Sequence, residues 1–222
     1  MNRYRELVRI RRSERRPQAA PMLVMILGLV LFLGTHAFSM ARAKRGEVIG
    51  RIGEGRFKLG YTLLSVLGLI LTVYGYGLYR QEGMIPVWSP PLWTRHLAVL
   101  LTLFAFISLA AAYLPGHLRA RLKHPMLLAV KIWATAHLLA NGDLGSILLF
   151  GSFLAWAVVA RISAKRRALT AGQVAQQHGG QATPAGWRND AIAVVVGVVA
   201  WFVFGKYLHP LLIGVAAWPG QA

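Results

Sequence analysis

The chain has 222 residues, of which 56% are hydrophobic and 14% are charged. These values exclude an ordinary soluble domain and indicate an integral membrane protein. The formal net charge of +18 could suggest nucleic-acid binding, but Lys and Arg lie mostly between apolar runs and no aromatic-basic binding motif occurs. A nucleic-acid partner is therefore not expected. The chain has no cysteine, which excludes disulfides and thiolate metal sites and leaves imidazole as the best metal ligand.

The N-terminal segment, residues 1–21, is strongly basic. It holds seven arginines between residues 3 and 16, and the first apolar run begins at Met22. Two interpretations remain open. Residues 1–21 are an over-extension of the reading frame upstream of a natural start at Met22, or they form a basic arm on the cytoplasmic side, which requires an odd number of spans. A secretory signal peptide is less consistent, because its apolar segment usually has only ~7–15 residues.

The rest of the chain contains apolar runs that are long enough to cross a membrane, since a hydrocarbon core of ~30 Å requires about 17–25 helical residues. The six runs are 22–41, 58–79, 96–114, 125–141, 143–160 and 190–213. The turn sequence Asn141-Gly142-Asp143 joins the fourth and fifth runs into a tight helical hairpin. We therefore expect an all-α protein, a polytopic transmembrane bundle of about six helices within residues 22–217.

Lys and Arg counts in the connecting segments predict the orientation of these helices. Six lie in residues 42–58, three in 119–123 and five in 161–188, whereas 80–95 hold two and 141–143 hold none. By the positive-inside rule the first, third and fifth connections face the cytoplasm, and the C-terminus lies outside. The sequence thus predicts a multi-pass protein of the cell (inner) membrane.

Two segments depart from the regular pattern of spans. Residues 162–189 are rich in Ala, Gln, Gly and Arg and lack periodicity, so we expect a flexible cytoplasmic loop there. Lys206, His209 and Pro210 interrupt the last apolar run. A re-entrant or interfacial piece over residues 210–217 is therefore an alternative to a continuing helix.

Two histidines lie inside apolar runs, where a polar ring needs a partner. His36 is about 9 Å inside the cytoplasmic end of the first run, and His137 is about 20 Å along the fourth run from His124. Trp133 and Asn141 lie one turn from His137 on the same face. Each immersed ring can form a hydrogen bond to a neighbouring helix, or the two can share a ligand such as haem iron. His124, at the water boundary, is explained as an interfacial residue.

Lys131 lies seven residues after His124, on nearly the same helix face. An unpaired ammonium at mid-membrane costs ~2.5–3.5 kcal/mol, so this side chain either extends to the cytoplasmic surface or binds an anion such as a haem propionate. Two other histidines are expected to be interfacial anchors near the outer surface, His96 and His209. Two in the cytoplasmic loops are assigned no role, His117 and His178.

Four stretches resemble the NnrU family: GTHAF at 34–38, RHLA at 95–98, HPMLLAVKIWATAHLLANGD at 124–143 and LHPLLIG at 208–214. The third stretch is the specific one, and the resemblance covers residues 22 to about 217. It implies a bacterial membrane protein linked to nitrite and nitric oxide reduction. The family that it resembles also includes the plant zeta-carotene isomerase, a membrane enzyme with a b-type haem held by histidines.

The resemblance also implies a site. The ligating histidines of the isomerase fall on His36 and His137, and His124 is a further family histidine. Where the isomerase pattern has a cysteine that can exchange as a ligand, this chain has Ala134, which puts redox-linked ligand switching in doubt. We therefore expect haem b to be ligated by His36 and His137, with His124 and Lys131 as further cofactor-binding residues.

Three functions remain open at this point. The first is a haem-binding membrane protein of denitrification, with the lipid bilayer, haem and components of nitrogen-oxide respiration as its partners. The second is a haem-dependent carotenoid cis-trans isomerase. The third is a non-enzymatic assembly or scaffold protein without a cofactor, whose histidines only connect helices. An absorbance spectrum of the purified protein separates the third from the other two.

Overall fold

The structure is a computed structural model that describes residues 19–170, 186–218 and 220. Across these ranges the chain is mostly helical, and the only strand-like feature is an isolated bridge between Pro86 and Asp143. The predicted all-α class is confirmed. Most of the basic extension, residues 1–18, and a segment that contains His178, residues 171–185, lie outside the described residues.

Five helical stretches among the described residues are long and apolar enough to cross a membrane. They are α2 (Ala19–Phe38), α4 (Glu54–Gln81), α5 (Leu92–Ala111), α8 (Leu144–Thr170) and the stretch Gly186–Ile213. A sixth apolar helix, α7 (Pro125–Ala140), has 16 residues and a length of about 24 Å. The polytopic helical bundle predicted from the apolar runs is therefore confirmed.

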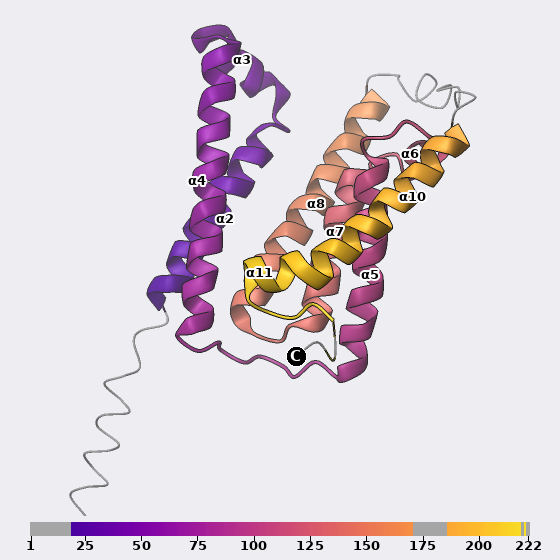
Figure 1. Ribbon diagram of the computed structural model, residues 1–222. Helices are drawn as coiled ribbons and strands as arrows, with labels where there is room; N and C mark the ends of the chain where they lie inside the picture. The colour runs from indigo at the N-terminus through magenta and orange to yellow at the C-terminus, as the bar shows by residue number, and fades with distance from the viewer. Residues whose placement is uncertain (1–18, 171–185, 219, 221–222) are drawn as a thin grey trace, which may run out of the picture. The chain divides into compact units, whose positions relative to one another are not determined.

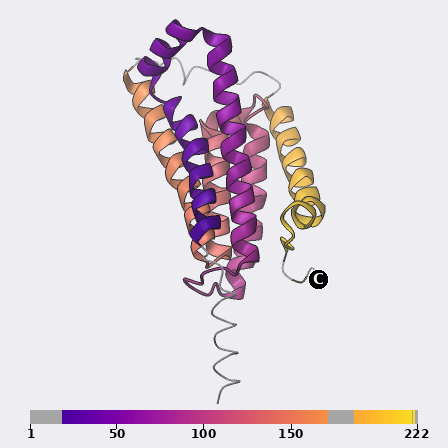
Figure 2. The ribbon, with the colours of Figure 1, turned by 90° about the vertical axis from the view of Figure 1, so that its left-hand side faces the viewer.

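The chain divides into two compact units. The described part of the first unit consists of the chain up to Val87 together with Asp143–Leu149, the start of α8. The second unit consists of Trp88–Gly142 and the described residues from Phe150 onward. In the first unit α2 and α4 lie side by side, with α3 (Arg42–Ile52) at one end (Figure 1, Figure 2).

Glycines bring α2 and α4 into close contact. A Cβ atom on Gly28 would lie 2.6 Å from the Thr72 hydroxyl oxygen, and one on Gly68 would lie 2.6 Å from the Phe32 backbone nitrogen. Real Cβ atoms are not found at such distances. Small residues at helix contacts allow backbones to approach closely in a membrane, where dispersion contacts drive helix association. These glycines therefore set the spacing of the pair that carries His36.

The basic connection expected at residues 42–58 is itself helical. It contains α3, which has no buried residue, and the first residues of α4. Gly53 separates the two helices with a φ of +82°, a conformation that favours glycine. A lipid-exposed span would be apolar, so the polar α3 fits a connection outside the apolar spans; its cytoplasmic side stays a prediction.

In the second unit α5 packs against both α7 and α10 (Gly186–Val203). A Cβ on Gly197 of α10 would lie 2.6 Å from the Ile107 Cα atom on α5. The indole N–H of Trp201 is 3.2 Å from both the Val99 carbonyl oxygen and the Thr102 hydroxyl. A polar group inside an apolar helix pair is satisfied in this way.

The two irregular segments are more helical than expected. Helix α8 continues to Thr170 and α10 begins at Gly186, so both ends of the expected loop 162–189 are helical. Helix α10 continues through a π-helix, η1 (Phe204–Leu208), into α11 (His209–Ile213). Pro210 lies in the first turn of α11, where its missing N–H is tolerated. The chain remains helical to Ile213 and is not helical over residues 214–217, and the re-entrant or interfacial alternative for 210–217 stays a prediction.

Candidate functional site

His36 lies on α2, two residues before the helix ends at Phe38. Its Nδ1 atom is 2.7 Å from the carbonyl oxygen of Phe32, one turn earlier. The imidazole ring centroid is 4.3 Å from that of Phe32 and 5.4 Å from that of Tyr61 on α4. The ring is therefore held between an aromatic side chain of its own helix and one of the neighbouring helix.

His137 lies on α7, three residues before the helix ends at Ala140. Its Nδ1 atom is 2.9 Å from the Trp133 carbonyl oxygen, and its ring stacks on Phe150 of α8 with centroids 4.4 Å apart. The Trp133 ring meets the edges of Phe150 and Phe153 at 5.1 and 5.4 Å. As the sequence predicted, Trp133 and Asn141 are its one-turn neighbours: the Asn141 side-chain amide donates to the His137 carbonyl oxygen.

His36 and His137, the two histidines inside apolar helices, share one hydrogen-bond arrangement. In each, Nδ1 faces a main-chain carbonyl oxygen four residues earlier. A carbonyl oxygen only accepts, so Nδ1 carries the proton and donates it, and the lone pair of the neutral ring lies on Nε2. A histidine that ligates a metal through Nε2 usually donates its other N–H to such a carbonyl. Both rings are therefore in the tautomer that ligation through Nε2 requires.

His124 is the N-cap residue of α7, directly before Pro125. Its carbonyl oxygen accepts a hydrogen bond from the Leu128 N–H at 3.0 Å, so it begins the helix as the sequence suggested. Burial and, to a smaller extent, the positive charges of Arg161 and Arg167 hold the pKa of the His124 imidazole below its usual value. These effects favour the neutral ring, which retains a lone pair for a ligand.

Lys131 is half-buried on α7, between His124 and His137. Within the described ranges it has neither a hydrogen bond nor an ion pair with a carboxylate. The two explanations drawn from the sequence, extension to the surface and pairing with a bound anion, both remain open.

The structure places the predicted site residues in two groups. His124, Lys131 and His137 share α7 in the second unit, whereas His36 belongs to the first unit. The pairing of His36 with His137 stays a prediction. Among the described residues no group of three or more His, Cys, Asp or Glu could hold a metal ion. A haem iron needs only two protein ligands, because its porphyrin supplies four nitrogens.

Sequence reasoning missed a polar network in the first unit. The Tyr76 hydroxyl is 2.7 Å from the Ser146 hydroxyl, which donates to Asp143 at 2.6 Å. The fully buried Tyr79 accepts hydrogen bonds at its hydroxyl from the Ile85 and Gly145 amides at 2.8 and 3.1 Å. The Asn141-Gly142-Asp143 turn could have indicated the contacts of Asp143 with Ser146, because aspartate commonly caps a helix that starts at the next residue.

A second polar contact, between α6 (His117–Leu122) and α10, was also missed. The Asp190 carboxylate accepts hydrogen bonds from the amides of His117 and Leu118 at 3.1 and 2.8 Å, and it pairs with the His117 ring at 3.0 Å. No local pattern indicates this contact, since its partners are more than 70 positions apart.

Comparison with known proteins assigns the family. The family described as NnrU protein matches residues 24–217. The match includes every helix from α3 to α11, nearly all of α2, and the four histidines at positions 36, 124, 137 and 209. A search of curated proteins and a search of solved structures found no match. Because the family match covers most of the chain, the protein belongs to the NnrU family.

Proposed function

We propose that this NnrU-family membrane protein binds haem b through His36 and His137, and that it acts in the cell (inner) membrane in the reduction of nitrite or nitric oxide. Components of nitrogen-oxide respiration are its proposed partners. The apolar helices support the membrane setting, and the proposed link to denitrification rests on the resemblance to the NnrU family.

One observation carries the haem proposal: both histidines inside apolar helices donate Nδ1–H to a carbonyl one turn earlier. Buried polar atoms usually have a hydrogen-bond partner, so a purely structural histidine between helices tends to place both ring nitrogens on protein groups or water. A haem ligand uses one nitrogen on the protein and the other on iron. Among the described residues, the His137 ring contacts aromatic rings and its own helix backbone, and His209 interacts with it electrostatically. No hydrogen bond within this part of the chain involves its Nε2, which we propose as the haem ligand.

The chain's own residues have defined tasks in this proposal. Bound haem supplies one-electron chemistry at its iron. The Phe150 ring restrains the His137 imidazole by stacking, and the Trp133 carbonyl fixes its tautomer. The Phe32 carbonyl does the same for His36. Lys131 would hold a propionate, which gives the half-buried ammonium the anionic partner that apolar surroundings require.

The spectrum of protein purified from haem-supplied cells tests the proposal. We expect a Soret band that sharpens and shifts on reduction, as a low-spin bis-imidazole centre does. His36→Ala or His137→Ala should remove most of the haem or make it high-spin. His96→Ala is the matched control, because His96 is exposed at the start of α5, and it should leave the spectrum unchanged.

Two further variants examine the choice of ligands. His124→Ala should leave the spectrum largely intact, whereas loss of the low-spin form in this variant would assign the second ligand to His124. Lys131→Met should weaken haem retention if the ammonium holds a propionate. If folded wild-type protein carries no haem even after supplementation, the haem proposal is wrong and the scaffold function takes its place.

A further inference from the structure

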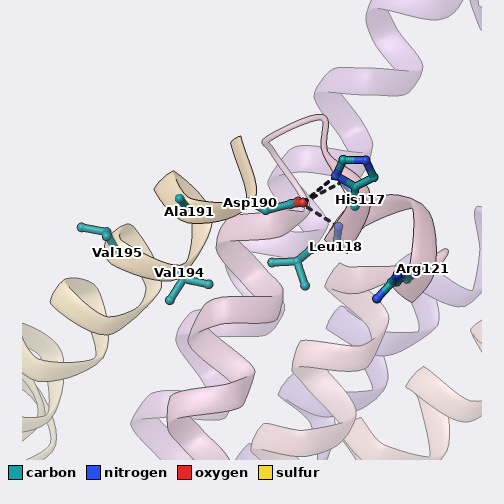
Figure 3. Close-up of a pocket in the computed structure, with 7 residues that line it drawn as sticks. All are labelled: His117, Leu118, Arg121, Asp190, Ala191, Val194 and Val195. Carbon is teal, nitrogen blue, oxygen red and sulfur yellow. Dashed lines mark hydrogen bonds and ion pairs between the residues drawn. The ribbon is translucent and has the colours of Figure 1, made fainter. Parts of the chain in front are cut away.

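A groove of about 490 Å³ lies between α6 and the first turns of α10 (Figure 3). Its apolar part is formed by Leu118 from α6 and by Val194 and Val195 from α10. Its polar part is formed by Arg121 and by the paired His117 and Asp190. The groove therefore has one apolar region and one charged region, which is the pattern that complements an amphiphilic ligand.

The charged region holds one cation without a carboxylate partner in the described parts of the chain, Arg121, beside the paired His117 and Asp190. The Asp190 carboxylate is occupied by two amides of α6 and by the His117 ring. Three further basic residues lie within two positions of Arg121 or Asp190 in the sequence, Arg119, Lys123 and Arg188. An anion would therefore be attracted to the Arg121 side.

The order of polar and apolar residues follows the depth of a membrane. Asp190 lies four residues from the start of α10 at Gly186, and Val194 and Val195 lie one turn further along the helix. The two valines are 39% and 61% exposed, as expected for side chains that face lipid. We therefore expect the charged part of the groove at the headgroup level and the apolar part against the acyl chains, on the side that the Lys and Arg counts predict to be cytoplasmic.

We propose that this groove binds an anionic glycerophospholipid, with the phosphate at Arg121 and an acyl chain against Leu118, Val194 and Val195. Basic pockets between membrane helices on the cytoplasmic side recognise anionic headgroups in this way. The occupant is a lipid and not a free phosphate, because the apolar residues of the groove need a chain to cover them. The site is independent of the proposed haem.

Native mass spectrometry of the detergent-solubilised full chain tests the proposal, with phosphatidylglycerol and phosphatidylcholine of identical acyl chains as probes. We expect tighter binding of phosphatidylglycerol. Arg121→Gln should weaken this binding about fivefold, since one basic residue contributes ~1 kcal/mol near an anionic surface, and Arg121→Lys should retain most of it. Val194→Trp, which fills the apolar region, should abolish the difference between the two lipids.

Arg51→Gln is the control, since it removes the same charge from the exposed helix α3 and should leave lipid binding unchanged. Glycerol 3-phosphate, which lacks acyl chains, should not displace the lipid. Equal binding of the two lipids by the wild type would overturn the proposal. So would unchanged binding by the folded Arg121→Gln and Val194→Trp variants, or an equal loss in the Arg51→Gln control. The folded state of each variant is checked by thermal unfolding.

Discussion

Two aspartates, one in each unit, bind the N-terminus of a helix in different ways. Asp143 precedes α8 and binds the amide and hydroxyl of Ser146, only three residues further along the chain. Asp190 binds the first amides of α6 from another helix, more than 70 residues away. Asp143 is buried with 8% of its surface exposed, whereas the Asp190 side chain is 20% exposed and its His117 partner 49%.

The comparison shows how burial decides how much one carboxylate contributes to the free energy of unfolding. A hydrogen bond removed from a buried site leaves a donor without water, whereas one removed near the surface is replaced by water. The Asp143 network also includes Tyr76 and adjoins the fully buried Tyr79. We therefore expect changes around Asp143 to lower the free energy of unfolding of the protein and changes around Asp190 to act locally.

Asp143→Ala should have the largest effect, a loss of about 3 kcal/mol in the free energy of unfolding. The change removes a helix cap to the Ser146 amide, which contributes about 0.5–2 kcal/mol, and it also removes the acceptor of the buried Ser146 hydroxyl, at a cost of about 1–3 kcal/mol. Equilibrium unfolding in detergent micelles measures it. Asp143→Asn, which keeps one acceptor oxygen, should lose less than half as much. An alanine variant as stable as the wild type would contradict the role given to this network.

Tyr79→Phe should have the next largest effect, about 2 kcal/mol. The Tyr79 hydroxyl accepts hydrogen bonds from two main-chain amides, those of Ile85 and Gly145, and no solvent reaches the buried ring to replace it. Tyr76→Phe is the matched control and should cost about 1 kcal/mol, because Ser146 keeps its bond to Asp143. The same unfolding assay compares them, and equal losses of unfolding free energy in the two variants would contradict the larger contribution given to the Tyr79 hydroxyl.

The helices were predictable from hydropathy, but their ends were not. The run predicted at 58–79 is the apolar part of α4, which extends from Glu54 to Gln81. Polar residues continue a helix beyond the lipid, here with an ion pair of 2.8 Å between Glu54 and Lys58, and hydropathy does not detect them. The polar helix α3 was missed for the same reason.

The candidate site was predictable where its contacts are local. The one-turn contacts of His137 with Trp133 and Asn141 follow from helical spacing, and both occur. The stacking of His137 on Phe150 and the contact of His36 with Tyr61 cross between helices. Such contacts depend on the rotation of each helix about its axis, which is set by packing and not by any local pattern.

Asp190→Asn should have the smallest effect, and it sharpens the comparison because it should leave the unfolding midpoint in place. The asparagine keeps one oxygen for the Leu118 amide, but it removes the charge that attracts the His117 ring. Since this contact is partly exposed, water can replace what is lost, and α6 should open more often without the protein unfolding. Hydrogen exchange followed by mass spectrometry should therefore show faster exchange of the His117 and Leu118 amides, with α5 and α7 unchanged.

His117→Ala, which removes the ring and keeps both amide bonds to Asp190, should accelerate this exchange less. If Asp190→Asn instead lowered the unfolding midpoint as much as Asp143→Ala, the distinction between the two aspartates would be wrong.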